Sequence, residues 1–451
     1  ERIKLQLAEE SDAFFEALDL KIPTSIRINK TKSCSSIANF ELNSLEKVNW
    51  NDKGYYLPER PIFTLDPSFQ AGAYYVQEAS SMFLGQVLRE ILPKLDPTAK
   101  ILDLCAAPGG KSTLILDEIP DSMLLVSNEV IKSRASTLVE NITKWGKSNV
   151  VVTSNDPKEF KKLAHYFDVI VVDAPCSGEG MFRKDTKAIE EWSENNVDIC
   201  VARQQRIIDE IMPALKPNGY LVYCTCTYSP KENEQNVARF TNDYSLKTIQ
   251  IPSNNTSGIL ENTENDILSY HFYPHKTKGE GFFISCMQKG NEPDTDIDAR
   301  TFKFEFLHKK QLPIVQKWVR NLENFDYIIW KEVITAIPIH HKYEIAYLCK
   351  NLFVLKKGVE LGKLMGDDII PSHELAMSEI ANNDINSCQF SKEEALIYFK
   401  KGDVSGFPTI ENLPNGWALA QYEGCNLGWI KKIGGRTNNY LPKELRILKD
   451  F

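Results

Sequence analysis

The sequence predicts an α/β fold whose central part, about residues 70–290, is a doubly wound, largely parallel sheet. Apolar runs of strand length recur there, and longer segments with helical patterning separate them. Strand, helix and strand in that order give right-handed crossovers, which place the strands parallel and the helices on both faces. The expected strands are Lys100–Leu104, Met123–Ser127, Val150–Thr153, Asp168–Val172 and Tyr220–Cys226, and helices are expected at Lys132–Trp145 and Lys187–Leu215.

Length and composition are those of a soluble multidomain protein. The chain has 451 residues, of which 42% are hydrophobic and 25% charged, and at about 150 residues per domain it would form roughly three domains. No uncharged apolar run approaches the ~18 residues of a membrane span, and the charged segment Glu1–Lys4 is unlike a signal peptide. The ten cysteines are scattered rather than arranged as a disulfide framework. We therefore expect a cytoplasmic protein with reduced cysteines, and neither a membrane protein nor a secreted one.

The net charge of −8 argues weakly against nucleic-acid binding, but the charge is unevenly distributed. Residues 1–300 carry a net charge of −10, whereas residues 301–451 carry +2. On charge alone, the basic residues near the end of the chain are read as a solvated surface. These residues are Lys431, Lys432, Arg436, Lys443, Arg446 and Lys449.

The segment after the first expected strand has the features of a ligand-binding loop. It reads Asp-Leu-Cys-Ala-Ala-Pro-Gly-Gly-Lys-Ser over residues 103–112. Its small residues and glycines let a ligand approach the backbone, and the helix that follows offers free N–H groups. A P-loop is excluded because that motif needs glycine where this chain has Cys105, and the dinucleotide motif G-x-G-x-x-G is also absent.

Acidic residues follow the next two strands. Glu129 stands roughly 20 positions past the glycine loop, where an acid is placed to accept hydrogen bonds from a ribose diol. Asp156 follows the third strand and could accept a hydrogen bond from an adenine amino group. Each acid alone is also consistent with a solvated loop end, but their placement after consecutive strands favours a ligand. A ribose-bearing ligand without a pyrophosphate fits best, and S-adenosylmethionine is the common case.

Cysteines follow the fourth and fifth strands. Cys176 comes after the fourth strand and Cys226 ends the fifth, so the two thiols are expected to face one pocket across neighbouring strand ends. Cys224 would share a face with Cys226 if the strand stays extended there. A zinc site is disfavoured, because no C-x-x-C exists and no histidine lies near in sequence. Buried structural thiols remain the alternative for any one cysteine.

Two thiols, a carboxyl group and a sulfonium donor together suit methylation of a pyrimidine. Carbon 5 of cytosine is a poor nucleophile, but addition of a thiolate to carbon 6 makes the ring an enamine that attacks an activated methyl group. An adjacent carboxyl group such as Asp173 can stabilise the charge at the N3 edge. The thiol must also ionise near neutral pH, and Lys111 is a candidate for the cation that promotes this ionisation.

Several long motifs resemble the Nop/Sun family of RNA cytosine-5 methyltransferases, most closely its bacterial branch that methylates small-subunit ribosomal RNA. They are Asp103–Lys111, Asp173–Gly180 and Thr225–Thr227, with further agreement at Ser25–Asn29, Tyr75–Glu78, Ser229–Glu234, Phe272–His275 and Gly279–Phe283. They keep their order over about residues 25–285. Beyond residue 300 the resemblance is weaker and rests on Gly424–Trp429, Lys431–Lys432 and Asn438–Pro442, which look like an RNA-binding module of the PUA type.

The resemblance implies the cofactor and the roles of the site residues. Cys226 would be the nucleophile and Cys176 would assist release of the methylated base, whereas the residues alone leave the choice between the two open. Cys224 departs from the family, whose members more often carry a small residue there. S-adenosylmethionine would be held by Cys105, Ala106, Ala107, Pro108, Gly109, Gly110, Lys111, Glu129, Asp156 and Asp173.

The resemblance also implies the domains and partners. A Rossmann-like methyltransferase core is expected at 69–288, after an N-terminal RNA-binding-type α/β domain at 1–68. An intermediate domain at 301–380 and a PUA-like β-barrel at 381–451 would follow, and the polar segment Gln288–Arg300 is the clearest linker. The expected partner is ribosomal RNA or the small ribosomal subunit, with no obligate protein partner. In this context the basic residues 431–449 are read as a phosphate-contacting surface.

Two other functions are compatible with parts of this sequence. A methyltransferase of DNA or of a small molecule is the first, but a small molecule would not require a basic C-terminal module, and related DNA enzymes carry a different motif around their cysteine. A non-catalytic ribosome-assembly factor that only binds RNA is the second, and it would be expected to lack Cys226 or Asp173, both of which are present.

Overall fold

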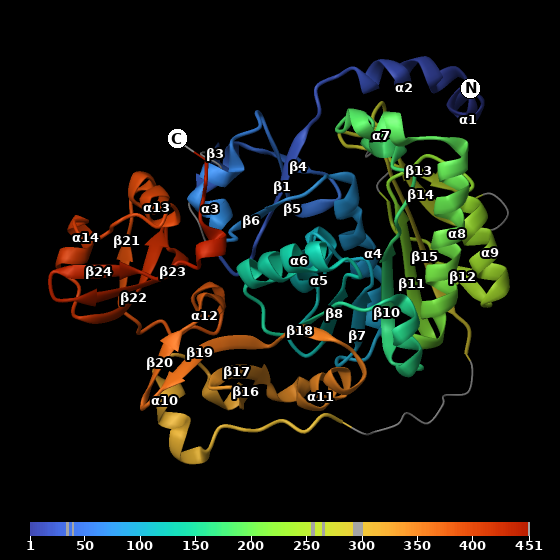
Figure 1. The fold of residues 1–451 in the computed structure, drawn as a ribbon. Coiled ribbons are helices and arrows are strands. Elements are labelled where there is room, and N and C mark those ends of the chain that lie inside the picture. Colours follow the sequence, from blue (N-terminus) through green and yellow to red (C-terminus); the bar gives the residue numbers. More distant parts are fainter. Residues whose placement is uncertain (33–35, 38–39, 254–257, 264–266, 292–300, 450–451) are drawn as a thin grey trace.

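The computed structural model describes residues 1–32, 36–37, 40–253, 258–263, 267–291 and 301–449. Its largest sheet runs through the middle of the molecule and confirms the predicted doubly wound α/β core (Figure 1). Residues 292–300 of the expected linker lie outside the described residues. None of the helices in the described ranges is long and apolar enough to cross a membrane.

The central sheet has the strand order β13-β14-β15-β11-β10-β7-β8-β9-β18, and β12 also pairs with β15. The five predicted strands are its parallel part, and the strand order reverses between β7 and β10. The parallel strands are β7 (Lys100–Asp103), β8 (Leu124–Asn128), β9 (Val150–Thr153), β10 (Phe167–Asp173) and β11 (Leu215–Thr225). The antiparallel strands are β12 (Leu246–Thr248), β13 (Leu260–Asn262), β14 (Ser269–Phe272), β15 (Phe282–Lys289) and β18 (Val354–Lys357).

Helices cover both faces because alternate residues of each strand point to opposite sides. Ile101, Val169 and Val171 pack in one core with α4 (Leu84–Ile91), α5 (Gly110–Glu118) and α6 (Lys132–Trp145). Leu102, Ile170 and Val172 pack in a second core with α8 (Glu194–Ile211), α9 (Glu234–Asp243) and α11 (Lys342–Asn351). The predicted helix 132–145 is confirmed. The expected helix 187–215 is instead α7 (Thr186–Glu191) and α8, because Trp192 is extended and the Ser193 side chain caps α8.

The N-terminal segment forms helices α1 (Arg2–Leu7), α2 (Ser11–Leu18) and α3 (Pro67–Gln70) with a four-stranded antiparallel sheet and a short hairpin. The sheet has the order β4-β5-β1-β6, with β1 (Thr24–Ile28), β4 (Glu46–Val48), β5 (Asn51–Leu57) and β6 (Tyr74–Val76), and the hairpin pairs β2 (Ser36–Ile37) with β3 (Phe40–Glu41). Because β6 pairs with β1, this sheet extends past residue 68, where the first domain was expected to end.

The C-terminal third contains two further four-stranded sheets (Figure 1). The first has the order β16-β17-β19-β20, with β16 (Phe325–Trp330), β17 (Val333–Pro338), β19 (Val359–Met365) and β20 (Asp368–Pro371), and it is flanked by α10 (Leu312–Gln316) and α12 (His373–Met377). The second has the order β21-β22-β23-β24, with β21 (Ser387–Gln389), β22 (Gly416–Tyr422), β23 (Cys425–Ile433) and β24 (Arg436–Asn439), and it carries α13 (Lys392–Phe399) and α14 (Pro408–Glu411).

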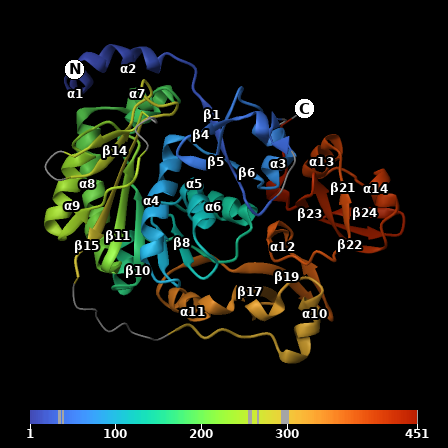
Figure 2. The same cartoon turned by 180° about the vertical axis from the view of Figure 1, so that it is seen from behind.

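The last segment packs against the first one. Seen from behind in Figure 2, the sheet of β21–β24 lies beside α3 and the N-terminal sheet. Ile26 and Tyr74 from the N-terminal sheet share one hydrophobic core with Phe390, Tyr398 and Leu427 from the C-terminal segment. Segments that are far apart in sequence therefore enclose one side of the central domain.

Candidate active site

The loop after β7 is held in a shape that leaves its backbone accessible at the start of α5. Gly109 has a φ of 116° and precedes the first residue of α5, a conformation that favours glycine. The neighbouring helix α6 fixes the loop from outside. Arg134 Nη2 donates a hydrogen bond to the carbonyl oxygen of Ala107 at 2.7 Å, and Asn141 Nδ2 donates one to that of Pro108 at 2.8 Å.

Glu129 lies beside this loop, at the end of β8. Its side chain is almost fully buried, and Oε1 accepts a hydrogen bond from the backbone N–H of Ile131 at 2.9 Å. Arg134 lies 3.6 Å from Oε2. Asp156 is farther out, beyond β9, where it accepts a hydrogen bond from the N–H of Lys158 and lies 3.4 Å from Arg206. Within the described residues, these contacts do not connect Asp156 to Glu129.

Lys111 and Asp173 form an ion pair across the ends of β7 and β10, with Nζ 2.8 Å from Oδ2. Burial of the ammonium opposes its charge, but attraction to Asp173 and to neighbouring acidic groups raises the pKa of Lys111 above its usual range. Lys111 was predicted to promote ionisation of a reacting thiol. Among the described residues it pairs with the carboxylate of Asp173, which compensates much of its charge, and its role toward a thiol stays a prediction.

Asp103 belongs to this group and was not predicted as a site residue. It is fully buried at the end of β7, and burial raises its pKa to about 7, opposed by a hydrogen bond from Ser112 Oγ at 2.6 Å. Its Oδ1 atom is buried without a hydrogen-bond partner among the described residues. The preference of strand ends for ligands, which singled out Glu129 and Asp173, applies equally to this position.

The two predicted thiols meet between the ends of β10 and β11. The sulfur atoms of Cys176 and Cys226 are 3.1 Å apart, and the backbone N–H of Cys226 donates to the Cys176 sulfur at 3.4 Å. The hydrogen bond with Cys226, burial and the charge of Cys226 raise the pKa of Cys176 well above its usual range. Cys224, by contrast, is fully buried in the core beneath α4–α6. It therefore packs as a structural thiol.

Buried polar side chains fasten the two cysteine-bearing loops to each other. Glu232 accepts hydrogen bonds from the N–H of Ser177 at 2.9 Å, from the Ser177 hydroxyl and from Gln204 Nε2 at 2.9 Å. Glu179 accepts from the N–H of Tyr228 at 3.1 Å, and the N–H of Gly180 donates to the carbonyl oxygen of Cys226 at 2.8 Å. The positions of both sulfur atoms therefore depend on residues that sequence reasoning did not assign to the site.

Arg27 and Asn29 join the N-terminal sheet to the central domain. Each is 1% exposed. Arg27 pairs with Asp117, and its Nη2 donates a hydrogen bond to Thr113 Oγ1 at 2.6 Å. Asn29 Nδ2 donates to the carbonyl oxygens of Gly72 and Trp145, both at 3.0 Å. Arginine and asparagine could contact RNA or pack inside the protein, and the burial of these two side chains favours packing.

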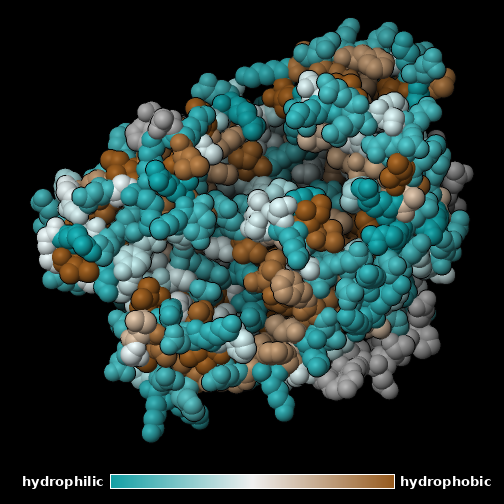
Figure 3. Space-filling view, in the orientation of Figure 1, coloured by the Kyte–Doolittle hydropathy of each residue, from teal (hydrophilic) through white to brown (hydrophobic). Residues whose placement is uncertain are grey.

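A hollow lies over the carboxyl end of the sheet, beneath α2 and α7 (Figure 3). A cavity of about 600 Å³ lies between the N-terminal sheet and the loop before α7, and its lining includes Gln77, Glu78 and three exposed basic residues. These basic residues are Lys21, Arg60 and Lys184. This face of the molecule therefore has both room and positive charge.

The described cysteines are mostly free thiols. Eight are unpaired, and Cys425 is disulfide-bonded, which corrects the expectation that all cysteines are reduced. In the same described ranges, no three His, Cys, Asp or Glu side chains come together as a group that could hold a metal ion.

Comparison with known proteins matches three consecutive family profiles to the chain. The profile described as "16S rRNA methyltransferase RsmB/F" matches residues 91–288. The "N-terminal domain of 16S rRNA methyltransferase RsmF" matches residues 1–79, and the "Methyltransferase RsmF PUA domain" matches residues 385–447. The chain belongs to the Nop/Sun family, in its branch of bacterial small-subunit ribosomal RNA methyltransferases.

The similarity to the proteins named next covers nearly the whole chain. The "Ribosomal RNA small subunit methyltransferase F" of Aliivibrio salmonicida is 28% identical over 457 residues, covering 96% of this chain and 93% of that protein. The protein of the same name from Shewanella piezotolerans is 28% identical and covers 93% of this chain and 90% of its own length.

Solved structures support the same fold. A methyltransferase homologue from Pyrococcus horikoshii has a TM-score of 0.52 at 25% identity, covering 64% of this chain and 98% of its own. NSun6 from the same organism, solved with the S-adenosylmethionine analogue SFG, has a TM-score of 0.54 at 20% identity and covers 64% of this chain and 97% of its own. At this identity the likeness shows a shared fold and no more.

The cofactor of the family is S-adenosylmethionine, and the residues present fit it. The open backbone at Gly109, the buried carboxylate of Glu129 and the unpartnered oxygen of Asp103 lie at the ends of neighbouring strands. Together they offer N–H donors and carboxylate acceptors and lack the glycine loop of a pyrophosphate site.

Proposed function

We propose that the protein methylates carbon 5 of a cytosine in 16S ribosomal RNA through a covalent adduct between the base and Cys226. The single observation that carries this proposal is the pair of thiols, 3.1 Å apart, beside the Lys111–Asp173 ion pair in a methyltransferase fold. A methyltransferase acting on an already nucleophilic oxygen or nitrogen atom needs no thiol at this position. Two thiols suit a carbon that must first be activated by addition to its neighbour.

The reaction begins when the Cys226 thiolate adds to carbon 6, which forms the S–C6 bond and moves the electron pair of the 5,6 double bond into the ring. Bound S-adenosylmethionine supplies an electrophilic methyl group on its sulfonium sulfur. Carbon 5 forms the new C–C bond to that methyl group while the bond from the methyl carbon to the sulfonium sulfur breaks and leaves its electron pair on that sulfur. The proton on carbon 5 then passes to solvent water. The S–C6 bond breaks, its electron pair returns to the Cys226 sulfur, and the 5,6 double bond is restored.

Asp173 and Cys176 have separate tasks in this scheme. Asp173 faces the N3 edge of the ring, and Lys111 fixes the orientation of its carboxylate at 2.8 Å. Cys176 keeps its proton because its pKa is raised, first by the hydrogen bond with Cys226. A protonated thiol next to the Cys226 sulfur can stabilise that sulfur as it leaves carbon 6, which supports the assignment of Cys176 to product release.

The N-terminal domain, the intermediate domain and the PUA-like domain are proposed to position the RNA. The cavity between the N-terminal sheet and the loop before α7 provides Lys21, Arg60 and Lys184 for phosphate contacts. The target base would be turned out of its stack to reach Cys226. The exposed part of residues 431–449 is proposed as a second RNA surface. Lys432 does not belong to it, because its ammonium group donates to the carbonyl oxygens of Ile410, Glu411 and Leu413.

The experiment that tests the reaction measures tritium transfer from labelled S-adenosylmethionine to naked small-subunit RNA, to isolated small subunits and to DNA. Digestion of the product to nucleosides should give label in 5-methylcytidine from RNA only. Label in another nucleoside, or in DNA, would contradict the proposal.

Cysteine variants test the adduct. Cys226→Ala should abolish transfer while cofactor binding stays unchanged, and Cys176→Ala should accumulate a protein–RNA adduct that survives on a denaturing gel. Cys349→Ala, at a half-buried thiol on α11, is the matched control and should behave like the unsubstituted protein. An adduct in Cys226→Ala but not in Cys176→Ala would reverse the two assignments.

A further inference from the structure

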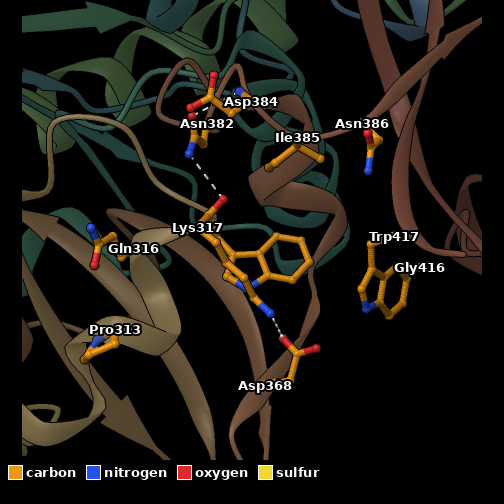
Figure 4. Close-up of a pocket in the computed structure, with 11 residues that line it drawn as sticks. Pro313, Gln316, Lys317, Asp368, Asn382, Asp384, Ile385, Asn386, Gly416 and Trp417 are labelled. Atoms are coloured by element: carbon orange, nitrogen blue, oxygen red, sulfur yellow. Dashed lines mark hydrogen bonds and ion pairs between the residues drawn. The ribbon is translucent and has the colours of Figure 1, made fainter. Parts of the chain in front are cut away.

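A second cavity, of about 670 Å³, lies where the two C-terminal sheets meet, in a part of the fold separate from the thiols (Figure 4). It is formed by the end of α10, by Asp368 at the start of β20, by the turn 382–386 and by Trp417 at the start of β22. Figure 4 shows Asn382, Asp384 and Ile385 on one side and Asp368 on another, with Trp417 apart from them across the opening. Its volume is within the range of about 300–1,000 Å³ that is typical of small-ligand pockets.

One wall of this cavity is an anchored aromatic ring. Trp417 is half-buried, and its ring lies 4.4 Å from that of Tyr440 in an edge-on arrangement. Lys431, its cross-strand neighbour on β23, places Nζ 4.8 Å from the centre of the Trp417 ring. A tryptophan held by its neighbours loses little conformational freedom on binding, so it can serve as a stacking platform for a planar ligand.

The cavity also contains polar groups that lack partners. Trp318 is 3% exposed, and its Nε1 atom has no hydrogen-bond partner among the described residues. Gln316 and Asn386 are exposed, and their side-chain amides make no hydrogen bond within those residues. An indole N–H donates, and a carboxamide both donates and accepts, which is the pattern needed to read the edge of a heterocyclic base.

The charges in the cavity favour an uncharged ligand. Lys317 lies on the lining, but its Nζ is 2.8 Å from Asp368, so the two charges compensate each other. Asp384, on the turn, would repel an anion and can accept a hydrogen bond from an exocyclic amino group. Lys431 contacts the Trp417 ring but does not line the cavity. A neutral planar ring therefore fits the cavity better than an anion does.

We propose that this cavity binds one unstacked base of the RNA substrate, at a site distinct from the cytosine that is methylated. The ring of that base stacks on Trp417 and its edge faces Asn386 and Trp318, while Gln316 lines the opposite end of the cavity (Figure 4). The site fixes the position of the RNA relative to the thiols without taking part in the reaction. The inference rests on the proposed function in one respect, namely that the partner is RNA.

The test uses the full chain and small-subunit RNA that carries 4-thiouridine, both naked and within isolated small subunits. Trp417→Ala should weaken RNA binding by about tenfold, as expected for the loss of one stacked base, whereas Trp417→Phe should keep most of the affinity. The double variant with Gln316→Ala and Asn386→Ala changes only exposed side chains and should weaken binding by about threefold or more. Trp330→Ala removes a tryptophan that is 66% exposed on β16 and is the matched control.

Crosslinking identifies what occupies the cavity. Irradiation should join the RNA to peptides that contain Trp417 or residues 382–386, and Trp417→Ala should abolish this crosslink while S-adenosylmethionine binding stays unchanged. Unchanged affinity in both cavity variants would overturn the inference. Weaker binding without an RNA crosslink at the cavity would assign it to a protein of the subunit and would also overturn it. If the unsubstituted protein forms this crosslink but makes no 5-methylcytidine, the proposed reaction fails and the cavity assignment stands.

Discussion

Replacing Arg27 by methionine should destabilise the protein by about 3–5 kcal/mol, the cost of removing one partner from a buried ion pair. Arg27 and Asp117 are 1% and 3% exposed, so water cannot replace the lost guanidinium. The substitution also removes hydrogen bonds to Gln77 at 2.7 Å and to Thr113 at 2.6 Å, and a cation–π contact 4.6 Å from the centre of the Trp145 ring.

The loss should depend on pH in a defined direction. Burial raises the pKa of Asp117 to about 6 even with Arg27 opposing it. Without Arg27, the pKa of this carboxyl group rises further above its value in the unfolded chain. A folded-state pKa above the unfolded one makes stability fall as pH rises through that interval. The difference in stability between Arg27→Met and the unsubstituted protein should therefore grow from pH 6 to pH 8.

Urea unfolding followed by tryptophan fluorescence measures this effect, since Trp145 contacts the guanidinium directly. The double variant Arg27→Met with Asp117→Asn buries no unpaired charge and should be more stable than the sum of the single losses by about 0.5–3 kcal/mol. A cost below about 1 kcal/mol for Arg27→Met, or strictly additive losses in the double variant, would refute the buried-pair reasoning.

Three further substitutions probe the site itself. Asp103→Asn removes a carboxyl group whose pKa is raised to about 7, mainly by burial. The unsubstituted protein should therefore lose stability relative to this variant as the pH rises from 4 to 7. Urea midpoints of the two proteins that run parallel across that range would contradict the raised pKa of Asp103. Glu232→Gln should lower kcat by about 10²-fold, because Ser177, next to Cys176, loses its charged acceptor. The affinity for S-adenosylmethionine, measured by calorimetry, should stay unchanged, and equal losses of kcat and affinity would indicate general unfolding. Asp173→Asn leaves the charge of Lys111 uncompensated and should lower kcat by about 10²–10³-fold in the tritium assay. Full activity of this variant would exclude a role for Asp173 at the N3 edge of the cytosine.

The sequence predicts the central sheet well because the information is local. Each strand is a continuous apolar run, and buried parallel strands have that pattern in many proteins. The meeting of Cys176 and Cys226 follows from the same reasoning, since consecutive parallel strands bring their carboxyl ends to one edge. These features need only the order of elements and the rule that ligands bind where strand order reverses.

The rest depends on contacts between distant segments that have no local pattern. Glu232 supports the Cys176 loop from 55 positions away, and Arg27 reaches Asp117 across 90 positions. Lys111 was expected to act on a thiol, but a carboxylate 2.8 Å away compensates its charge. The choice between RNA contact and packing for Arg27 likewise depends on burial, which only the assembled structure shows.

Strand β18 has a consequence for how the chain is made. It covers the outer edge of β9, and the amide of Asn155 exchanges hydrogen bonds with the backbone of Phe353, 198 positions later. At ~5–20 residues per second, a ribosome needs roughly 10–40 s to synthesise the intervening segment. Throughout that interval, the apolar run Val150–Val152 is an open sheet edge of the kind that pairs with other chains. A nascent chain that stops before residue 354 keeps this edge permanently exposed, so premature termination ahead of β18 should produce aggregates rather than a smaller working enzyme.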